Sequence, residues 1–156
     1  MIERFTRRQE GSTALELALV LPVLLVLFLG ICDMGFLLFQ QMQVQAAADA
    51  GAAFAMARGP AAFNATTIGN VVTAAAYPTQ TAITGAASWT CGCPNGTSGI
   101  AVVAGTPPNC GASPSCSNGF APGLFVRVTA QATPTPIFAW PGYPALVRSG
   151  VLVRIR

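Results

Sequence analysis

A long apolar run over residues 17–39 constrains this chain more than any other feature of its sequence, and Asp33 is the charged residue within it. At about 1.5 Å per residue, a helix of this length spans roughly 34 Å, which matches the hydrocarbon core of a bilayer. Pro22 removes one backbone donor early in the run, so we expect a bend or a covering neighbour there. The run therefore predicts a transmembrane helix over residues 12–39.

Asp33 is a candidate functional residue, because an ionisable group inside a membrane segment is costly and rarely accidental. It stands near the outer end of the run, where its side chain can either reach the membrane interface or meet a partner inside a complex. Residues 1–11 form a basic leader that contains three arginines. Arginines that flank a first span favour the cytoplasmic side, so we expect a cytoplasmic N-terminus and a C-terminal domain on the outer side. A removable secretory signal is the alternative, but the apolar run is longer than a usual signal core.

Small residues follow the apolar run. Residues 40–59 are rich in alanine, a strong helix former, and Gly59-Pro60 is a typical helix stop. We therefore expect one helix over residues 12–58, with residues 40–59 as its continuation outside the membrane. A second, short helix is predicted over residues 64–77. Its apolar face is expected to contain Ile68, Val71, Val72, Ala75 and Ala76.

Residues 60–156 are predicted to form a small α+β outer domain. Strands are expected over residues 82–93, 124–133 and 147–155, and the second of these alternates cleanly between apolar and polar side chains. Residues 94–123 are interpreted as a loop rich in Gly, Pro, Asn and Ser. The pattern predicts a three-stranded antiparallel sheet that is half-buried against an apolar helix face.

The charge distribution excludes most chemistry in the outer domain. All five acidic residues precede residue 60, and the chain has no histidine. General acid–base catalysis would therefore depend on Tyr, Cys or Arg. The chain has no lysine, and its arginines form no basic stripe that could follow phosphates. We expect no catalytic residue, no cofactor, no small-molecule substrate and no nucleic-acid partner.

Four of the five cysteines lie close together on the expected outer side, which indicates a disulfide framework in an exported domain. They are Cys91, Cys93, Cys110 and Cys116. Zinc is disfavoured, because the spacing lacks C-x-x-C pairs and histidine. A Cys91–Cys93 bridge would be strained. We expect Cys93–Cys110 nested inside Cys91–Cys116, each bridge stabilising the fold by about 2–4 kcal/mol. A thiol redox protein that uses Cys91 and Cys93 is an alternative.

The N-terminal residues carry a resemblance to a known family. Gly11-Ser12 followed by Glu16 and an apolar run resembles a prepilin-peptidase site. Residues 8–25 resemble the TadE-like family, the minor pseudopilins of the tight adherence (Flp) pilus system, and residues 29–35 and 40–59 also fit that family.

The resemblance implies a location, a processing step and a set of partners. The protein would lie in the bacterial inner membrane as a single-pass protein, with a periplasmic C-terminal domain or a place in an extracellular pilus. A prepilin peptidase would cut between Gly11 and Ser12. Glu16 would then pair with the new N-terminal amine of a neighbouring subunit, and Pro22 and Asp33 would contribute to assembly. The expected partners are other pilins or pseudopilins and the pilus assembly machinery.

Two departures refine this resemblance. Ser12 stands where major type IV pilins usually have Phe, and Leu17 stands where Flp shaft subunits usually have Tyr. Both favour a minor pseudopilin. Glu16 has a simpler interpretation as a carboxylate near the helix start, favoured by the helix dipole. The rival function is a signal-anchored extracytoplasmic binding module that never enters a filament.

Overall fold

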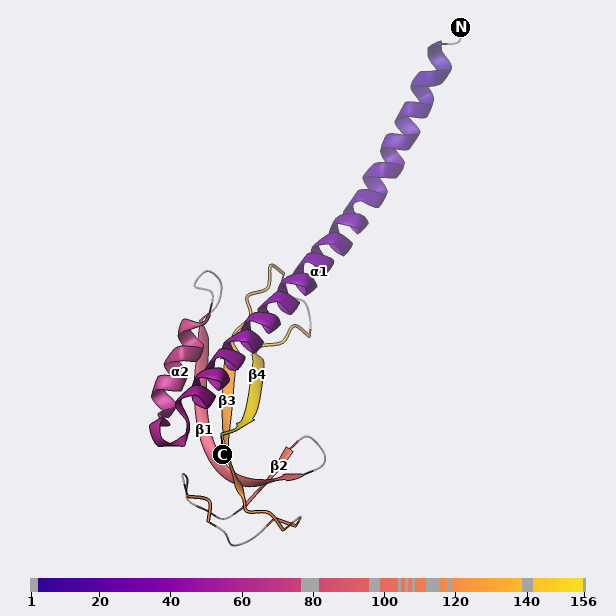
Figure 1. Ribbon diagram of the computed structural model, residues 1–156. Helices are drawn as coiled ribbons and strands as arrows, with labels where there is room; N and C mark the ends of the chain where they lie inside the picture. Colours follow the sequence, from indigo (N-terminus) through magenta and orange to yellow (C-terminus); the bar gives the residue numbers. More distant parts are fainter. Residues whose placement is uncertain are drawn as a thin grey trace. The chain divides into compact units, whose positions relative to one another are not determined.

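The computed structural model describes residues 3–76, 82–95, 99–103, 105, 107, 109–111, 116–117, 119–138 and 142–155. The chain divides into two compact units. The first unit comprises Met1–Leu38 and Pro136–Tyr143, and the second comprises Phe39–Thr135 and Pro144–Arg156. The fold is α+β, with a long apolar N-terminal helix and a small antiparallel sheet (Figure 1).

Helix α1 runs from Glu3 to Arg58 and contributes residues to both units. It ends where the sequence predicts, because Gly59 adopts a φ of 69° and its N–H donates to the carbonyl oxygen of Ala55 at 3.1 Å. Its start is earlier than residue 12, since the leader consists mainly of residues compatible with helix and contains no proline. Pro22 lies within the helix without ending it.

A short 3-10 helix, η1 (Pro60–Ala62), precedes helix α2 (Ala65–Ala74). The Oδ1 atom of Asn64 caps α2 by accepting a hydrogen bond from the N–H of Thr67 at 3.0 Å. The helix is therefore shorter than the predicted 64–77, and residue 77 lies outside the described residues.

The buried face of α2 differs from the predicted one. Ile68, Gly69 and Val72 are buried, whereas Val71 is half-buried and Ala75 is exposed. The helix packs on strand β1 through its glycine, because a Cβ atom at Gly69 would lie 3.0 Å from the carbonyl oxygen of Gly85. Because of this close approach, the face of α2 that contains Gly69 packs against β1, which the apolar pattern alone does not indicate.

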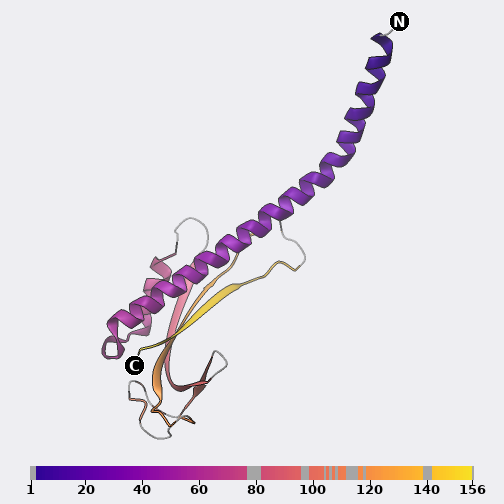
Figure 2. The same ribbon diagram turned by 45° about the vertical axis from the view of Figure 1, so that its right-hand side comes forward.

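The sheet has four strands, so the prediction of three was wrong. They are β1 (Ile83–Asn95), β2 (Gly99–Val102), β3 (Gly123–Ala132) and β4 (Val147–Arg154). Their order is β2-β1-β3-β4, and every neighbouring pair is antiparallel (Figures 1 and 2). The additional strand β2 lies in the predicted loop, where it pairs with the far end of β1. It is too short to show the alternation that identifies a strand in sequence.

The core of the second unit lies between the sheet and the C-terminal part of α1. On β3, Val126, Val128 and Ala130 are buried while Arg127 and Thr129 are exposed, as the alternation predicts. The buried positions of α1 on this side are mostly small: Val44, Ala47, Ala48, Gly51, Ala52 and Ala55. They let the helix approach closely enough to cover the sheet beside α2 (Figures 1 and 2).

Two contacts show how tightly α1 lies on the sheet and on α2. A Cβ atom at Gly51 would stand 2.5 Å from Cγ2 of Val72 and 2.9 Å from Cγ1 of Val128. The hydroxyl of Ser149 on β4 donates a hydrogen bond to Oε1 of Gln45 on α1. Residues 39–58 of α1 are therefore a structural element of the second unit.

Candidate functional site on the N-terminal helix

The N-terminal part of α1 exposes a continuous apolar surface. Every described residue from 13 to 28 is exposed. Among the described helices, α1 contains a stretch that is long and apolar enough to cross a membrane, and no residue of that stretch is buried. A soluble monomer rarely exposes so large an apolar area. The helix is therefore compatible with a single membrane anchor.

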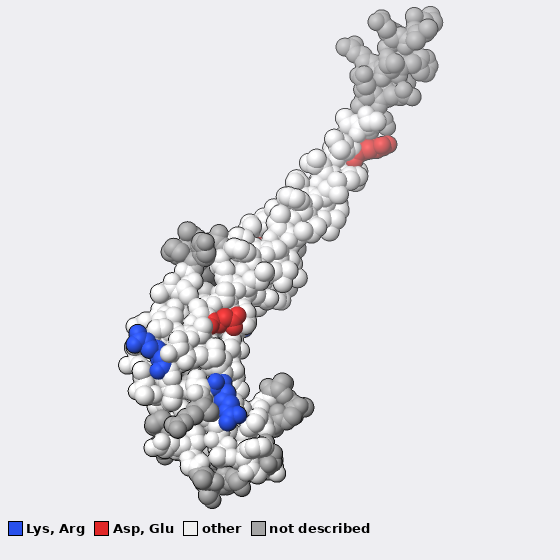
Figure 3. Space-filling model, viewed as in Figure 1, with Lys and Arg blue, Asp and Glu red and all other residues white. Residues whose placement is uncertain are grey.

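Glu16 lies on this surface, and its side chain is exposed between Leu15 and Leu17, which are 70% and 62% exposed. Gly11 and Ser12 belong to the same helix. At about 1.5 Å per residue, Glu16 stands roughly 7 Å along the helix axis from Gly11. Figure 3 shows one acidic side chain next to uncharged side chains on the apolar part of the helix. The structure therefore presents a carboxylate in apolar surroundings close to the predicted cleavage position.

Asp33 binds a distant segment of its own chain. The backbone N–H of Ile137 donates to Oδ1 at 2.8 Å, and the N–H of Phe138 donates to Oδ2 at 3.0 Å. The side chain of Asp33 is 2% exposed. All three residues belong to the first unit. The sequence singles out Asp33 but gives no signal that links it to residues more than a hundred positions later.

Tyr143 is another polar residue of the first unit. Its hydroxyl oxygen is buried and has no hydrogen-bond partner in the part of the chain that the structure describes. Burial and, to a smaller extent, the negative charge of Asp33 raise the pKa of the Tyr143 phenol above its usual value near 10. The phenol is therefore neutral at physiological pH. Together, Asp33 and Tyr143 place two polar groups against an otherwise apolar segment.

The disulfides join Cys91 to Cys110 and Cys93 to Cys116, with Cα–Cα distances of 5.3 and 5.5 Å. The prediction of a disulfide framework is correct, but the nested pairing, Cys93–Cys110 inside Cys91–Cys116, was wrong. All four cysteines are buried.

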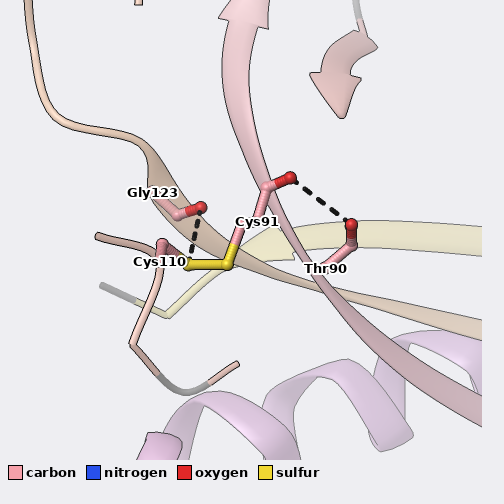
Figure 4. The surroundings of a disulfide bond; sticks show 4 residues. All are labelled: Thr90, Cys91, Cys110 and Gly123. Carbon is pink, nitrogen blue, oxygen red and sulfur yellow. Dashed lines mark hydrogen bonds between the residues drawn. A yellow bond between two sulfur atoms is a disulfide. The ribbon is translucent and has the colours of Figure 1, made fainter. Parts of the chain in front are cut away.

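Figure 4 shows the surroundings of the bridge between Cys91 and Cys110. Cys91 and Gly92 lie opposite Leu124 and Gly123 in the ladder of β1 and β3. The sulfur of Cys110 lies 3.7 Å from the carbonyl oxygen of Gly123, a close contact in which the bridged sulfur has no proton to donate. Cys110 therefore lies at the start of β3, next to Cys91 on β1, and the bridge that forms there leaves Cys93 to pair with Cys116.

Removing the first disulfide is expected to destabilise the second unit. In a Cys91→Ala/Cys110→Ala variant, the 19-residue separation suggests a loss of about 3 kcal/mol, because the unfolded chain is no longer constrained. Denaturant unfolding of the full chain in detergent, followed by near-ultraviolet circular dichroism, measures this loss. The matched control is Cys32→Ala, which removes a free thiol. An unfolding midpoint equal to that of this control would contradict the expectation.

Comparison with known proteins identifies the N-terminal part of the chain. The family model described as TadE-like protein matches residues 11–53. No curated protein and no solved structure matched the chain. The matched residues contain Glu16, Pro22 and Asp33, together with most of the helix that covers the sheet. The resemblance that the sequence shows is thus confirmed over residues 11–53, which are similar to the TadE-like family.

Proposed function

We propose that this protein is a minor pseudopilin that acts as an assembly component of a tight adherence (Flp) pilus. The observation that carries the proposal is the exposed carboxylate of Glu16 in an unburied apolar helix that matches the TadE-like family. Before assembly, the bacterial inner membrane shields the apolar surface from water. In the pilus or its basal complex, helices of other pilins or pseudopilins take the place of the lipid.

Glu16 gives this helix a preference for assembly. An ionised carboxylate is costly in a bilayer unless it finds a partner. Cleavage between Gly11 and Ser12 by a prepilin peptidase creates an amine at Ser12, and in a neighbouring subunit this amine is a suitable counter-charge. The pair is favourable only where both groups meet in good geometry, which links charge neutralisation to subunit contact. The same cleavage removes the basic leader, residues 1–11.

The second unit supports a structural function for the outer domain. Its sheet is covered on one face by α1 and α2, and its four cysteines form buried bridges. Buried structural cysteines are chemically inert, whereas catalytic thiols are partly exposed and lie near positive charge. This favours a structural protein over the redox alternative. A binding module would have the same anchor and the same outer domain. It would be neither cut by a prepilin peptidase nor incorporated in a filament.

Processing provides the direct test of the proposed function. In cells with an active prepilin peptidase, intact-mass measurement of the purified protein is expected to find a chain that begins at Ser12. A Gly11→Val variant is expected to keep residues 1–11, because the bulky side chain blocks the small position before the cut. The matched control is Gly30→Ala, at a helical glycine where an added Cβ atom meets no atom within 4 Å. A wild-type protein that retains Met1 under these conditions would overturn the pseudopilin proposal.

A further inference from the structure

The segment Pro136–Phe138 exposes apolar side chains beside the outer end of the apolar helix. Ile137 is 60% exposed and Phe138 is 44% exposed. Their backbone N–H groups are held by Asp33. On the same turns of α1 as Asp33, Ile31 and Met34 are 72% and 63% exposed. The first unit therefore exposes apolar side chains from two distant parts of the sequence.

The hydrogen bonds to Asp33 suit this surface to a lipid environment. A loop in water satisfies its backbone N–H groups with solvent, and an unsatisfied N–H group in a bilayer costs several kcal/mol. Here one buried carboxylate satisfies the N–H groups of two consecutive apolar residues. Residues 136–143 contain no charged side chain. The segment can therefore enter the less polar part of a membrane without leaving these donors unpaired.

The position of Asp33 agrees with the membrane interface. From Leu17 to Asp33 a helix rises roughly 24 Å, so Asp33 lies near one end of a hydrocarbon core that is about 30 Å thick. Exposed apolar residues continue along α1 on both sides of Asp33. With the anchor placed in this way, the side chains of Ile137 and Phe138 would stand near the boundary between the acyl chains and the headgroups.

We propose that Pro136–Phe138 is a second membrane contact, which inserts Ile137 and Phe138 into the interfacial layer of the leaflet at the Asp33 end of the anchor. Asp33 is the positioning residue that holds the segment on the helix. The ligand is the lipid surface. This inference rests on the proposed membrane anchor, and it adds a contact that restricts rotation and tilt of the helix.

Spin labelling of the full chain in phosphatidylethanolamine/phosphatidylglycerol vesicles tests this contact. A nitroxide is attached to Ile137→Cys in the Cys32→Ala background, with both disulfides intact. Reference labels stand at Leu25 in the apolar helix and at the exposed Ala86 on the sheet. The label at residue 137 is expected to lose collisions with a water-soluble nickel chelate and to gain collisions with oxygen, as the label at residue 25 does. The label at residue 86 is expected to remain accessible to nickel.

The other outcomes distinguish the inference from the anchor on which it rests. Nickel access at residue 137 equal to that at residue 86, with residue 25 protected, would overturn the lipid contact alone. Nickel access at residue 25 would overturn the anchor and the inference with it. Spin–spin broadening at residue 137 in dilute vesicles would show that a second copy of the chain, rather than lipid, contacts this residue, and it would overturn the lipid contact.

An Asp33→Ala substitution separates the positioning role of Asp33 from the affinity of the apolar side chains of Ile137 and Phe138 for lipid. It is expected to restore nickel access at residue 137 while residue 25 stays protected, because the segment is no longer held on the helix. Asp33→Asn keeps one acceptor oxygen and is expected to retain part of the protection. Full protection at residue 137 in a folded Asp33→Ala variant would overturn the positioning role of Asp33.

Discussion

Replacing Glu16 with alanine is expected to leave the protein in the membrane and to stop the proposed function in pilus assembly. The substitution removes the one carboxylate on the exposed apolar part of α1 that the structure describes, between residues 13 and 28. Insertion into the bilayer becomes easier, since an ionisable residue is replaced by an apolar one. Assembly loses the counter-charge for the amine of the neighbouring subunit.

The size of the effect follows from the energetics of a buried ion pair. Removing one partner of such a pair leaves the other charge unpaired in a medium of low polarity, at a cost of about 3–5 kcal/mol. With a tenfold change in equilibrium for about each 1.4 kcal/mol, incorporation is expected to fall by roughly two to three orders of magnitude. Counting pili by electron microscopy measures the functional loss. Immunoblotting of membranes checks that the protein is still present.

Asp49→Ala is the matched control for Glu16→Ala. Asp49 is an exposed carboxylate on the same helix, but it lies in the part of α1 that packs on the sheet. It accepts weak hydrogen bonds from Gln45 at 3.4 and 3.5 Å. Its removal is expected to leave pilus number unchanged. Normal pilus assembly with the Glu16→Ala protein would refute the pairing role and favour the simpler interpretation of Glu16 as a carboxylate near the helix start.

Replacing Gly85 with alanine is expected to destabilise the second unit severely. A Cβ atom at this position would stand 2.4 Å from Cβ of Val72 and 2.8 Å from the carbonyl oxygen of Gly69. Neither atom is the end of a flexible side chain, so α2 must move away from β1 to make room. Overpacking of this kind costs about 3 kcal/mol, at the upper end of the usual range. For a domain of this size, the loss corresponds to a fall in Tm of roughly 12–20 °C.

Gly150→Ala separates this clash from the general effect of alanine in a strand. The nearest atom to a Cβ at Gly150 is Cγ2 of Thr129 at 3.5 Å, which is an ordinary contact. Both substitutions reduce the freedom of the unfolded chain equally, so a difference between them reports the packing of α2 on β1. Thermal unfolding of the full-length variants in the same detergent gives the comparison. Equal midpoints for the two variants would contradict the packing of α2 through Gly69 and Gly85.

The sequence by itself determined the features that depend on neighbouring residues. The length and apolarity of residues 17–39 predict the exposed helix, and Gly59 with Pro60 marks its end. The alternation of residues 124–133 predicts which side chains of β3 face the core. The short motif around Gly11 and Glu16, with the apolar run, indicates the TadE-like resemblance that the family comparison confirms over residues 11–53. Each of these signals is local, because helix and strand periodicities are properties of adjacent residues.

The tertiary structure alone decided which distant residues meet. Four cysteines indicate two bridges, but their pairing depends on which cysteine the folded chain brings next to Cys91, at the start of β3. Strand β2 is defined by its partner rather than by its own pattern. Asp33 stands out in the sequence as a charge in an apolar run, yet its hydrogen bonds reach Ile137 and Phe138 across more than a hundred residues. Such contacts depend on the path of the folded chain, and no spacing in the sequence specifies that path.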